Sequence, residues 1–276
     1  MIKENNIKII FLSLSLLLII LIFFFPFFWI ITSSFKSPEE IIATSTTIIP
    51  RSFTLEHYNK ILFNSDFFIY LKNSLIVSFS SMIISIILSV SAAYGLHKLK
   101  FYGNKFVEYS LLVTYAFPGV ILLVPIYLLF AKVNLLNSYF ALIIVNVLFA
   151  TPFAVWMLKA FFKLIPNEIE EAAYIDGASR YIVISRIIVP LAAPGIASVA
   201  IFCFIISWTE YLFASILISG DDLKTLPVGL AGIVGQYQID WGFLLSGAVL
   251  ASLPVILLFV FIGKYFVSGL TEGAVK

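Results

Sequence analysis

The sequence contains few of the residues on which metal binding, redox chemistry and acid–base catalysis depend. Its 276 residues include one cysteine and two histidines. The single cysteine, Cys203, cannot form a disulfide within the chain, and no cluster of cysteine, histidine or carboxylate side chains has the spacing of a metal site. No Gly-x-x-x-x-Gly-Lys-Ser/Thr string occurs, which excludes that type of phosphate-binding loop. We therefore expect no metal, no cofactor and no catalytic residue in this chain.

Charge is also scarce. Only 12% of the residues are charged and the formal net charge is +2. No basic cluster is present, so a nucleic-acid partner is not expected. In contrast, 61% of the residues are hydrophobic and the mean hydropathy is +1.08. A water-soluble domain could not bury this much apolar surface, which indicates a membrane protein.

Long apolar runs set the expected fold class. A helix needs roughly 20 predominantly apolar residues to cross a bilayer. The first run is too long for a signal peptide and no small-x-small cleavage pattern follows it, so a retained anchor span is expected. We predict an all-α membrane protein with six transmembrane helices and divide it into 1–68, the anchor span with the first external loop, and 69–276, the core. The six predicted spans are 9–31, 69–96, 107–131, 138–160, 191–218 and 242–267.

Lysine and arginine residues predict the orientation of these spans. They flank the two chain ends and the connections 97–106 and 161–190, whereas few lie in the short loops on the opposite side. The longer loop 32–68 adds three of them to that opposite side. The positive-inside rule therefore places both termini and segment 161–190 in the cytoplasm. His57 and His97 then lie on opposite sides of the membrane and cannot form a pair.

Segment 161–190 is the one long amphipathic, charged stretch between spans, and it predicts a helix-turn-helix. Asn167 is predicted as the N-cap, with Glu170 completing a capping-box-like pair. Gly177 is predicted to end the first helix in a left-handed conformation. A second helix is expected from Ser179 to Val189, before Pro190. Taken alone, such a segment is most often a solvated loop whose charges keep it out of lipid.

The residue pattern of this segment is more specific. Glu171 to Ala178 reads Glu-Ala-Ala-x-x-Asp-Gly-Ala, followed by Ile187, Val189 and Pro190. This string resembles the EAA loop of the membrane subunits of ATP-binding-cassette (ABC) importers, and its full length is similar to the sugar-importing branch. Val189 stands where that family usually has leucine. The resemblance implies a type I importer permease whose loop docks on the ATPase subunit. The residues to which this coupling role is carried over are Glu170, Glu171, Ala172, Ala173, Asp176, Gly177, Ala178 and Arg180.

Further strings extend the resemblance over most of the chain. Ser33-Ser34-Phe35-Lys36 and the later Phe53-Thr54-Leu55-x-x-Tyr58 are similar to the segment after the family's first span. The terminal string 269–276 is similar to the family's GLTxGAVK ending. External loop 219–241 resembles the loop that in some relatives reaches into the sugar-binding protein. The contact candidates in it are Leu223, Thr225, Pro227 and Gly229.

The resemblance also implies the partners and the location. It implies a second homologous permease subunit, two ABC ATPase subunits that bind the ATP and magnesium, an extracytoplasmic sugar-binding protein and the bilayer of the cell membrane. This chain would then form half of the path for a mono- or oligosaccharide. It would have no enzymatic activity of its own.

Polar residues inside predicted spans are costly and are candidates for the translocation path. Asn146 falls near the middle of the fourth predicted span. Thr209 stands where the family usually has the asparagine of a Trp-Asn-Glu string. Glu210, the next residue, either lines the path or pairs with a neighbouring helix. Pro118 and Gly119 interrupt the third predicted span, either as a packing kink or as part of a gate. The path candidates are Asn146, Pro118, Gly119, Ser207, Thr209 and Glu210.

A different class of function also fits an apolar chain with several spans. A stand-alone secondary transporter or channel for a small polar solute would need no ATPase. Such proteins typically contain inverted repeats and intramembrane carboxylates for ion coupling. We find no convincing internal repeat, and Glu210 is the only clear acid that we assign to a span. The sequence therefore favours the importer subunit.

Overall fold

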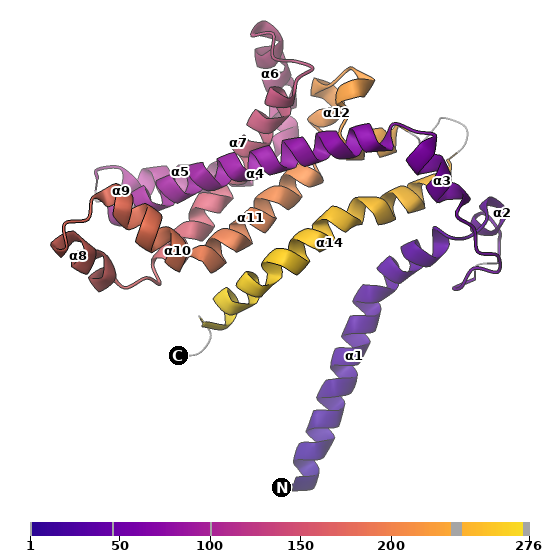
Figure 1. The fold of residues 1–276 in the computed structure, drawn as a ribbon, viewed down its shortest axis with the longest axis horizontal. Coiled ribbons are helices and arrows are strands. Elements are labelled where there is room, and N and C mark those ends of the chain that lie inside the picture. The colour runs from indigo at the N-terminus through magenta and orange to yellow at the C-terminus, as the bar shows by residue number, and fades with distance from the viewer. Residues whose placement is uncertain (1, 46, 100, 233–238, 273–276) are drawn as a thin grey trace. The chain divides into compact units, whose positions relative to one another are not determined.

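The computed structural model describes the whole chain except residues 1, 46, 100, 233–238 and 273–276. Within this described part, the regular secondary structure consists of helices (Figure 1). The chain forms two compact units. The first comprises Met1–Phe67 and Leu230–Leu253, and the second comprises Phe68–Gly229 and Pro254–Lys276.

The first unit contains the apolar helix α1 (Ile2–Ser33) and two short helices, α2 (Pro38–Ile41) and α3 (Glu56–Phe63). It also contains the beginning of α14 (Trp241–Glu272). Leu12–Ser33 is long and apolar enough to cross a membrane, and none of its most apolar window is buried within the chain. An apolar helix without protein cover suits a lipid-facing span.

The second unit is built around α7 (Tyr139–Phe162), which packs against α5 (Asn104–Ala116) and α11 (Ala193–Trp208). Its longest helix is α4 (Phe67–Lys98). The unit is completed by α6 and by short elements that connect the spans. Those are α8 (Asn167–Ile175), α9 (Arg180–Ile182), the π-helix η1 (Val183–Ile188), α10 (Val189–Leu191), α12 (Ala214–Leu217), the 3-10 helix η2 (Asp221–Leu223) and α13 (Leu226–Ala231).

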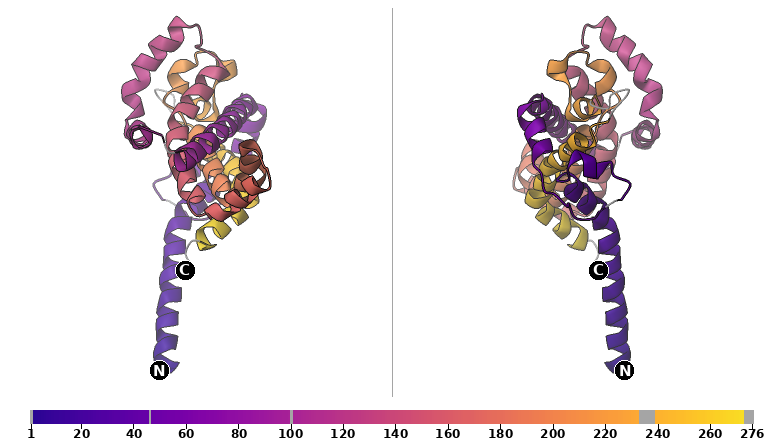
Figure 2. Two further views of the ribbon diagram at one scale, coloured as in Figure 1. Left: turned by 90° about the vertical axis from the view of Figure 1, so that its left-hand side faces the viewer. Right: turned by 90° about the vertical axis from the view of Figure 1, so that its right-hand side faces the viewer.

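One of the six predicted spans is bent, and a second bend lies at the start of another. The third is divided into α5 and α6 (Gly119–Lys132), which meet at 95°; Figure 2 shows α6 along its length and α5 end-on. Phe117 is extended, as expected before Pro118, and the helix restarts at Gly119. Pro125, in contrast, lies inside α6 without ending it. The second bend, of 79°, separates Arg180–Leu191 from α11.

The structure thus confirms the expected spans to different degrees. In the described part of the chain four unbroken helices are long and apolar enough to cross a membrane, and up to six spans result if each bent pair counts as one. The predicted span 191–218 was too long, because α11 ends at Trp208 and a turn separates it from α12. The predicted span 138–160 matches α7. Ser138 caps the start of α7, because its side chain accepts a hydrogen bond from Ala141 N at 3.2 Å.

A stripe of buried serines runs along α4 and was not predicted from the sequence. Its small side chains recur every three or four residues and allow neighbouring helices to approach closely. The Ser85 hydroxyl accepts a hydrogen bond from Thr151 of α7 at 3.4 Å, and Phe79 of α4 packs on Phe204 of α11. The sequence does contain a signal for this stripe, because small residues recur there at the spacing of one helical turn. The stripe consists of Ser74, Ser78, Ser81, Ser85 and Ser89.

Candidate functional site

The segment with the strongest motif folds as two helices joined by a tight turn, here called the polar hairpin (residues 167–182). Gly177 has φ +82°, and its N–H donates to Tyr174 O at 3.1 Å. The N–H of Ala178 reaches back to Ala173 O at 2.9 Å. These bonds satisfy the free carbonyls at the end of α8, and only glycine adopts this backbone conformation without strain. The predicted left-handed stop at Gly177 is confirmed.

The predicted capping box is wrong. The N-cap position belongs to Pro166, and Asn167 is already the first helical residue, with no side-chain capping bond at this end. Glu170 cannot complete the box because its carboxylate is buried and faces α4, where Lys98 Nζ lies 2.8 Å from Oε1. This contact is an ion pair whose angles fall outside those of a directed hydrogen bond. Tertiary pairing therefore prevails over the local capping pattern.

The helical run that starts with the second helix of the hairpin ends later than predicted. It begins at Arg180, close to the expected Ser179, but continues through η1 and α10 to Leu191. Pro190 lies in the first turn of α10, where its missing N–H costs least. The π-helix before it shifts the hydrogen-bond register, so the proline does not end the helical run.

The hairpin has two distinct faces. Glu170 and Ala173 are buried, with Ala173 in the same apolar cluster as Tyr94, Leu158 and Phe162. Ala178 is half-buried. The opposite face is exposed and carries the remaining predicted coupling residues. These are Glu171, Ala172, Asp176, Gly177 and Arg180.

Asn146, the first path candidate, is only 3% exposed on α7. Its Nδ2 donates to Leu142 O at 2.9 Å, one turn earlier in the same helix. Its Oδ1 is buried and has no hydrogen-bond partner. Most buried polar atoms are paired, so an orphaned amide oxygen inside a span marks an unusual position.

The other polar path candidates lie at the end of α11. Ser207 is buried with an unpaired hydroxyl, whereas Thr209 is exposed. Glu210 lies beyond the helix end, and its two carboxylate oxygens accept hydrogen bonds from Phe213 N at 2.7 Å and Ala214 N at 2.9 Å. It therefore caps the start of α12 instead of lying within a continuous span, which corrects its predicted placement.

Pro118 and Gly119 lie at the 95° bend between α5 and α6. Space around Gly119 is tight, because an added Cβ would lie 3.3 Å from Phe149 Cζ and 3.5 Å from Phe213 Cε2. These rings are 5.3 Å apart and connect α7 with the segment just before α12. The bend is therefore a packed junction. Asn146, Ser207 and the bend are placed by three different elements.

The four predicted binding-protein contacts in external loop 219–241 differ in their exposure. Thr225 and Gly229 are buried, while Leu223 and Pro227 are half-buried. The loop is fastened to α4, since Asn73 Nδ2 donates to Asp222 O at 2.9 Å and to Lys224 O at 2.8 Å. A Cβ on Gly229 would lie 2.1 Å from the Tyr70 ring. This fixed geometry leaves Leu223 and Pro227 with the more accessible side chains.

In the first unit the two motif strings after α1 are brought together. The rings of Phe35 and Tyr58 stack at 5.0 Å, and the Ser34 and Tyr58 hydroxyls are 2.7 Å apart. The Lys36 ammonium donates to Thr47 O at 2.6 Å and lies 4.3 Å from the centre of the Trp29 ring. These contacts make the segment after α1 an ordered structure, not an open loop.

His57 belongs to the predicted external loop 32–68, but its side chain is buried. It is 3% exposed, and its Nε2 lies 2.9 Å from Lys36 O. Gly242 permits this burial, because a Cβ there would lie 2.0 Å from His57 Cε1. No local pattern indicates the contact with Gly242, which joins residues far apart in the chain.

An open cavity of about 620 Å³ lies beside His57 in the same unit. Asp240 at its wall forms an ion pair with Lys60. Burial by itself raises the pKa of Asp240. The hydrogen bonds from Lys60 and from Phe243 N, together with the charges of Lys60 and His57, outweigh burial and hold the pKa below its ordinary value. The cavity lining is Pro38, Ile41, Ile42, Glu56, His57, Lys60, Ile239, Asp240, Trp241 and Gly242.

The terminal GLTxGAVK-like string lies partly outside the described residues. Helix α14 reaches Glu272, and Gly273 to Lys276 are not described. Within the described part of the chain no group of three or more histidine, cysteine or carboxylate side chains is arranged to hold a metal ion.

Known relatives match nearly the whole chain. It is 39% identical over 253 residues to the inner membrane ABC transporter permease protein YcjP of Escherichia coli K12, covering 90% of each chain. It is 34% identical over 248 residues to the sulfoquinovosyl glycerol transport system permease protein SmoH of Agrobacterium fabrum, covering 90% of this chain and 87% of that one. It is 32% identical over 251 residues to the trehalose/maltose transport system permease protein MalG of Thermococcus litoralis, covering 90% of each chain.

A solved structure has the same fold. A chain of a bacterial ABC transporter involved in the import of the acidic polysaccharide alginate superposes with a TM-score of 0.81 over 96% of this chain and 98% of that chain, at 22% identity. At this identity the likeness concerns the fold alone. Residues 85–272 match the family described as binding-protein-dependent transport system inner membrane component. With its apolar spans and its exposed polar hairpin, this chain belongs to the binding-protein-dependent transport system inner membrane components.

Proposed function

We propose that this chain is one of two membrane subunits of an ABC importer for a mono- or oligosaccharide. Several relatives are named for the transport of sugars or sugar derivatives, including trehalose/maltose and sulfoquinovosyl glycerol. The single observation that carries the coupling role is the division of the polar hairpin into a buried face and an exposed face. A rigid element with an exposed, charged face has the form of a docking surface for a partner.

The partners follow from this role. Two ATPase subunits would bind ATP and magnesium on the cytoplasmic side and contact Glu171, Asp176 and Arg180. A second permease would complete the path, and an external sugar-binding protein would deliver the substrate near Leu223 and Pro227. Family membership supports the binding protein and the membrane location. Both termini and the polar hairpin would then face the cytoplasm.

Transport would proceed by alternating access. Closure of the ATPase subunits on ATP displaces the polar hairpin, and the displacement passes through α11 and α7 to the spans that line the path. Asn146 is the best path candidate, because its buried Oδ1 lacks a partner and a sugar hydroxyl is a suitable donor for it. Ser207 offers a second unpaired hydroxyl. Glu210, which caps α12, would act by holding that turn.

The test is reconstitution of the chain with the permease, ATPase and binding-protein subunits encoded by neighbouring genes. ATP hydrolysis in proteoliposomes is measured with the binding protein empty and loaded with each of a panel of sugars. We expect at least one loaded form to stimulate hydrolysis and uptake. Uptake that follows an ion gradient without any ATPase subunit would contradict the importer and favour the stand-alone transporter.

A matched pair of variants tests the docking face. Glu171 and Glu168 are both exposed carboxylates of α8, but only Glu171 belongs to the predicted coupling set. Glu171→Lys should reduce stimulated hydrolysis, whereas Glu168→Lys should retain it. Equal activity of the two variants would contradict the assignment of the docking face.

A further inference from the structure

We propose that Glu170 is a positioning residue that fastens the polar hairpin to α4, so that α4 moves with the hairpin during transport. This inference rests on the proposed function and assigns Glu170 a role different from that of its neighbour Glu171. Glu171 faces outward, where a partner can reach it, whereas Glu170 is 5% exposed and faces inward. The two adjacent carboxylates therefore serve opposite faces of one helix.

The fastening uses two points on α8. Lys98, at the end of α4, lies 2.8 Å from Glu170 Oε1 and donates to Asn167 Oδ1 at 2.6 Å. The second oxygen of Glu170 accepts a hydrogen bond from the Tyr94 hydroxyl at 3.2 Å. The hydroxyls of Tyr94 and Tyr174 are also 3.2 Å apart. One lysine thus holds two positions of α8 a turn apart, which fixes the rotation of α8 about its own axis.

The chain itself provides no direct connection between these helices. Asn167 and Lys98 are 69 residues apart in sequence. The hairpin is joined through the backbone to α7 on one side and to the run leading into α11 on the other. A displacement of α8 can therefore pass directly to α4 only through side chains.

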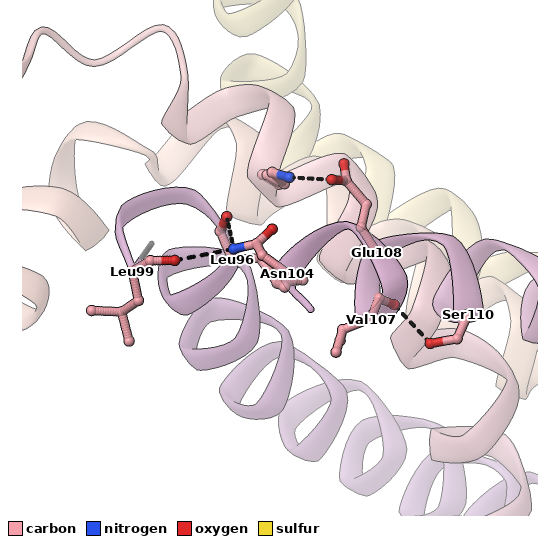
Figure 3. A network of polar contacts seen from close by, with 7 residues as sticks. Leu96, Leu99, Asn104, Val107, Glu108 and Ser110 are labelled. Carbon is pink, nitrogen blue, oxygen red and sulfur yellow. Dashed lines mark hydrogen bonds and ion pairs between the residues drawn. The ribbon is translucent and has the colours of Figure 1, made fainter. Parts of the chain in front are cut away.

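Further polar contacts lead from α4 into the helix core (Figure 3). Asn104, at the start of α5, donates to Leu96 O at 3.0 Å, in the last turn of α4, and to Leu99 O at 3.1 Å, just beyond the end of α4. Glu108, one turn later in α5, accepts a hydrogen bond from Lys159 of α7 at 2.6 Å. Polar contacts thus connect α8, α4, α5 and α7 in series, and all of them lie within the second unit.

The energetics favour a geometric role over a purely stabilising one. The cost of removing two charges from water largely offsets the attraction of a buried ion pair. Breaking such a pair by removing one partner is nevertheless costly, because the remaining charge stays buried. The pair therefore contributes little net stability, but it strongly disfavours any state in which α8 separates from α4.

The first test is a charge-exchange experiment in the complete importer in proteoliposomes. Glu170→Gln, Lys98→Met and the exchanged pair Glu170→Lys with Lys98→Glu are compared by the ratio of sugar-stimulated to basal ATP hydrolysis in assembled complex. We expect each single variant to lower this ratio about fivefold or more, the lower range of measured coupling, and the exchanged pair to recover part of the loss. Glu168→Gln, which removes an exposed carboxylate from the same helix, should leave it unchanged.

The second test measures movement and does not depend on the sugar. Spin labels on α4 at Ser91 and on α8 at Ile175, both exposed, report the distance between the helices in complexes with and without ATP, with Cys203 replaced by alanine. The distance should stay constant on ATP binding in the otherwise unchanged chain and should change in Glu170→Gln.

The outcomes separate the two proposals. If the single variants lower only the yield of complex and not the ratio, or if the label distance changes on ATP binding before any charge is removed, the positioning role is overturned. If no loaded binding protein stimulates hydrolysis but the label distance behaves as expected, the fastening of α4 stands and the sugar-importer function fails.

Discussion

Gly177 is the residue whose backbone the polar hairpin depends on most. Its φ of +82° is in the left-handed region, and an added Cβ would meet no atom within 4 Å. The cost of a substitution here is therefore conformational and not steric. This makes Gly177 a position at which backbone geometry can be tested separately from packing.

We predict that Gly177→Val destabilises the hairpin by about 1–2 kcal/mol, the penalty of the left-handed conformation for an L-residue. Stimulated ATP hydrolysis of the assembled importer should fall with it. Gly177→Asn is the matched control, because asparagine tolerates this conformation, and it should retain most of the activity. Full stimulation in the valine variant would show that the turn geometry is not needed for coupling.

Asn146 offers a test at a second single residue. Its Oδ1 is buried without a partner, so replacing the side chain by an apolar one of similar volume should leave stability nearly unchanged. We predict that Asn146→Leu assembles normally, unfolds at the same temperature and transports poorly. A lower unfolding temperature with unchanged uptake per assembled complex would instead assign Asn146 to helix packing.

At the scale of elements, close glycine contacts hold the short helices in place. Gly229 of α13 lies so close to Tyr70 of α4 that a Cβ would be 2.1 Å from Cδ2 of the ring. We predict that Gly229→Val lowers the unfolding free energy by about 1–3 kcal/mol, the usual cost of overpacking. Thermal unfolding of the purified complex measures this loss.

A second substitution checks that the loss comes from this contact. Combining Gly229→Val with Tyr70→Ala should recover stability relative to the valine variant, because the space taken by the ring becomes free. Tyr70→Ala alone serves as the reference. A double variant no more stable than the sum of the two single losses would refute the proposed steric origin.

The contact between α3 and the start of α14 in the first unit should respond to pH. Because its pKa is lowered in the folded state, Asp240 contributes stability above the ordinary aspartate pKa of about 3.9, and the contribution is lost as pH falls through the lower folded value. Hydrogen exchange of α3, corrected for its intrinsic pH dependence, should accelerate in this acid range. Lys60→Met should shrink this acid-linked acceleration, because without the lysine the folded pKa of Asp240 no longer lies as far below the ordinary value. An unchanged acceleration would contradict the ion pair's role.

At the scale of the whole molecule, the proposed orientation decides which partners each face can meet. Cys203 is fully buried and can be replaced by alanine to give a background without reactive thiols. We predict that a cysteine introduced at Ser179 is labelled by an impermeant reagent only from the cytoplasmic side, and one at Ser45 only from outside. Both serines are exposed, so access to the reagent depends on the side of the membrane. The reverse pattern would separate the polar hairpin from ATP and overturn the coupling proposal.

Local patterns in the sequence were sufficient to predict the class of the protein and the place of its main motif. Continuous apolar runs long enough to cross a bilayer predicted α1, α4, α7 and α14 because hydrocarbon requires every backbone group to be bonded within the helix. The left-handed stop at Gly177 was also predictable, because it depends on one residue and its immediate neighbours. These features share a local cause.

Other features depend on contacts between residues far apart in the sequence, which local patterns do not predict. Glu170 and Glu171 are adjacent and chemically identical, and only the position of Lys98 at the end of α4 makes one a buried partner and the other a surface residue. His57 is buried because Gly242, 185 positions later in the sequence, leaves room for its ring. The end of α11 at Trp208 likewise depends on Glu210 capping the next turn. In each case the energy comes from groups distant in sequence, or from competition between local bonds, and periodicity alone carries no information about either.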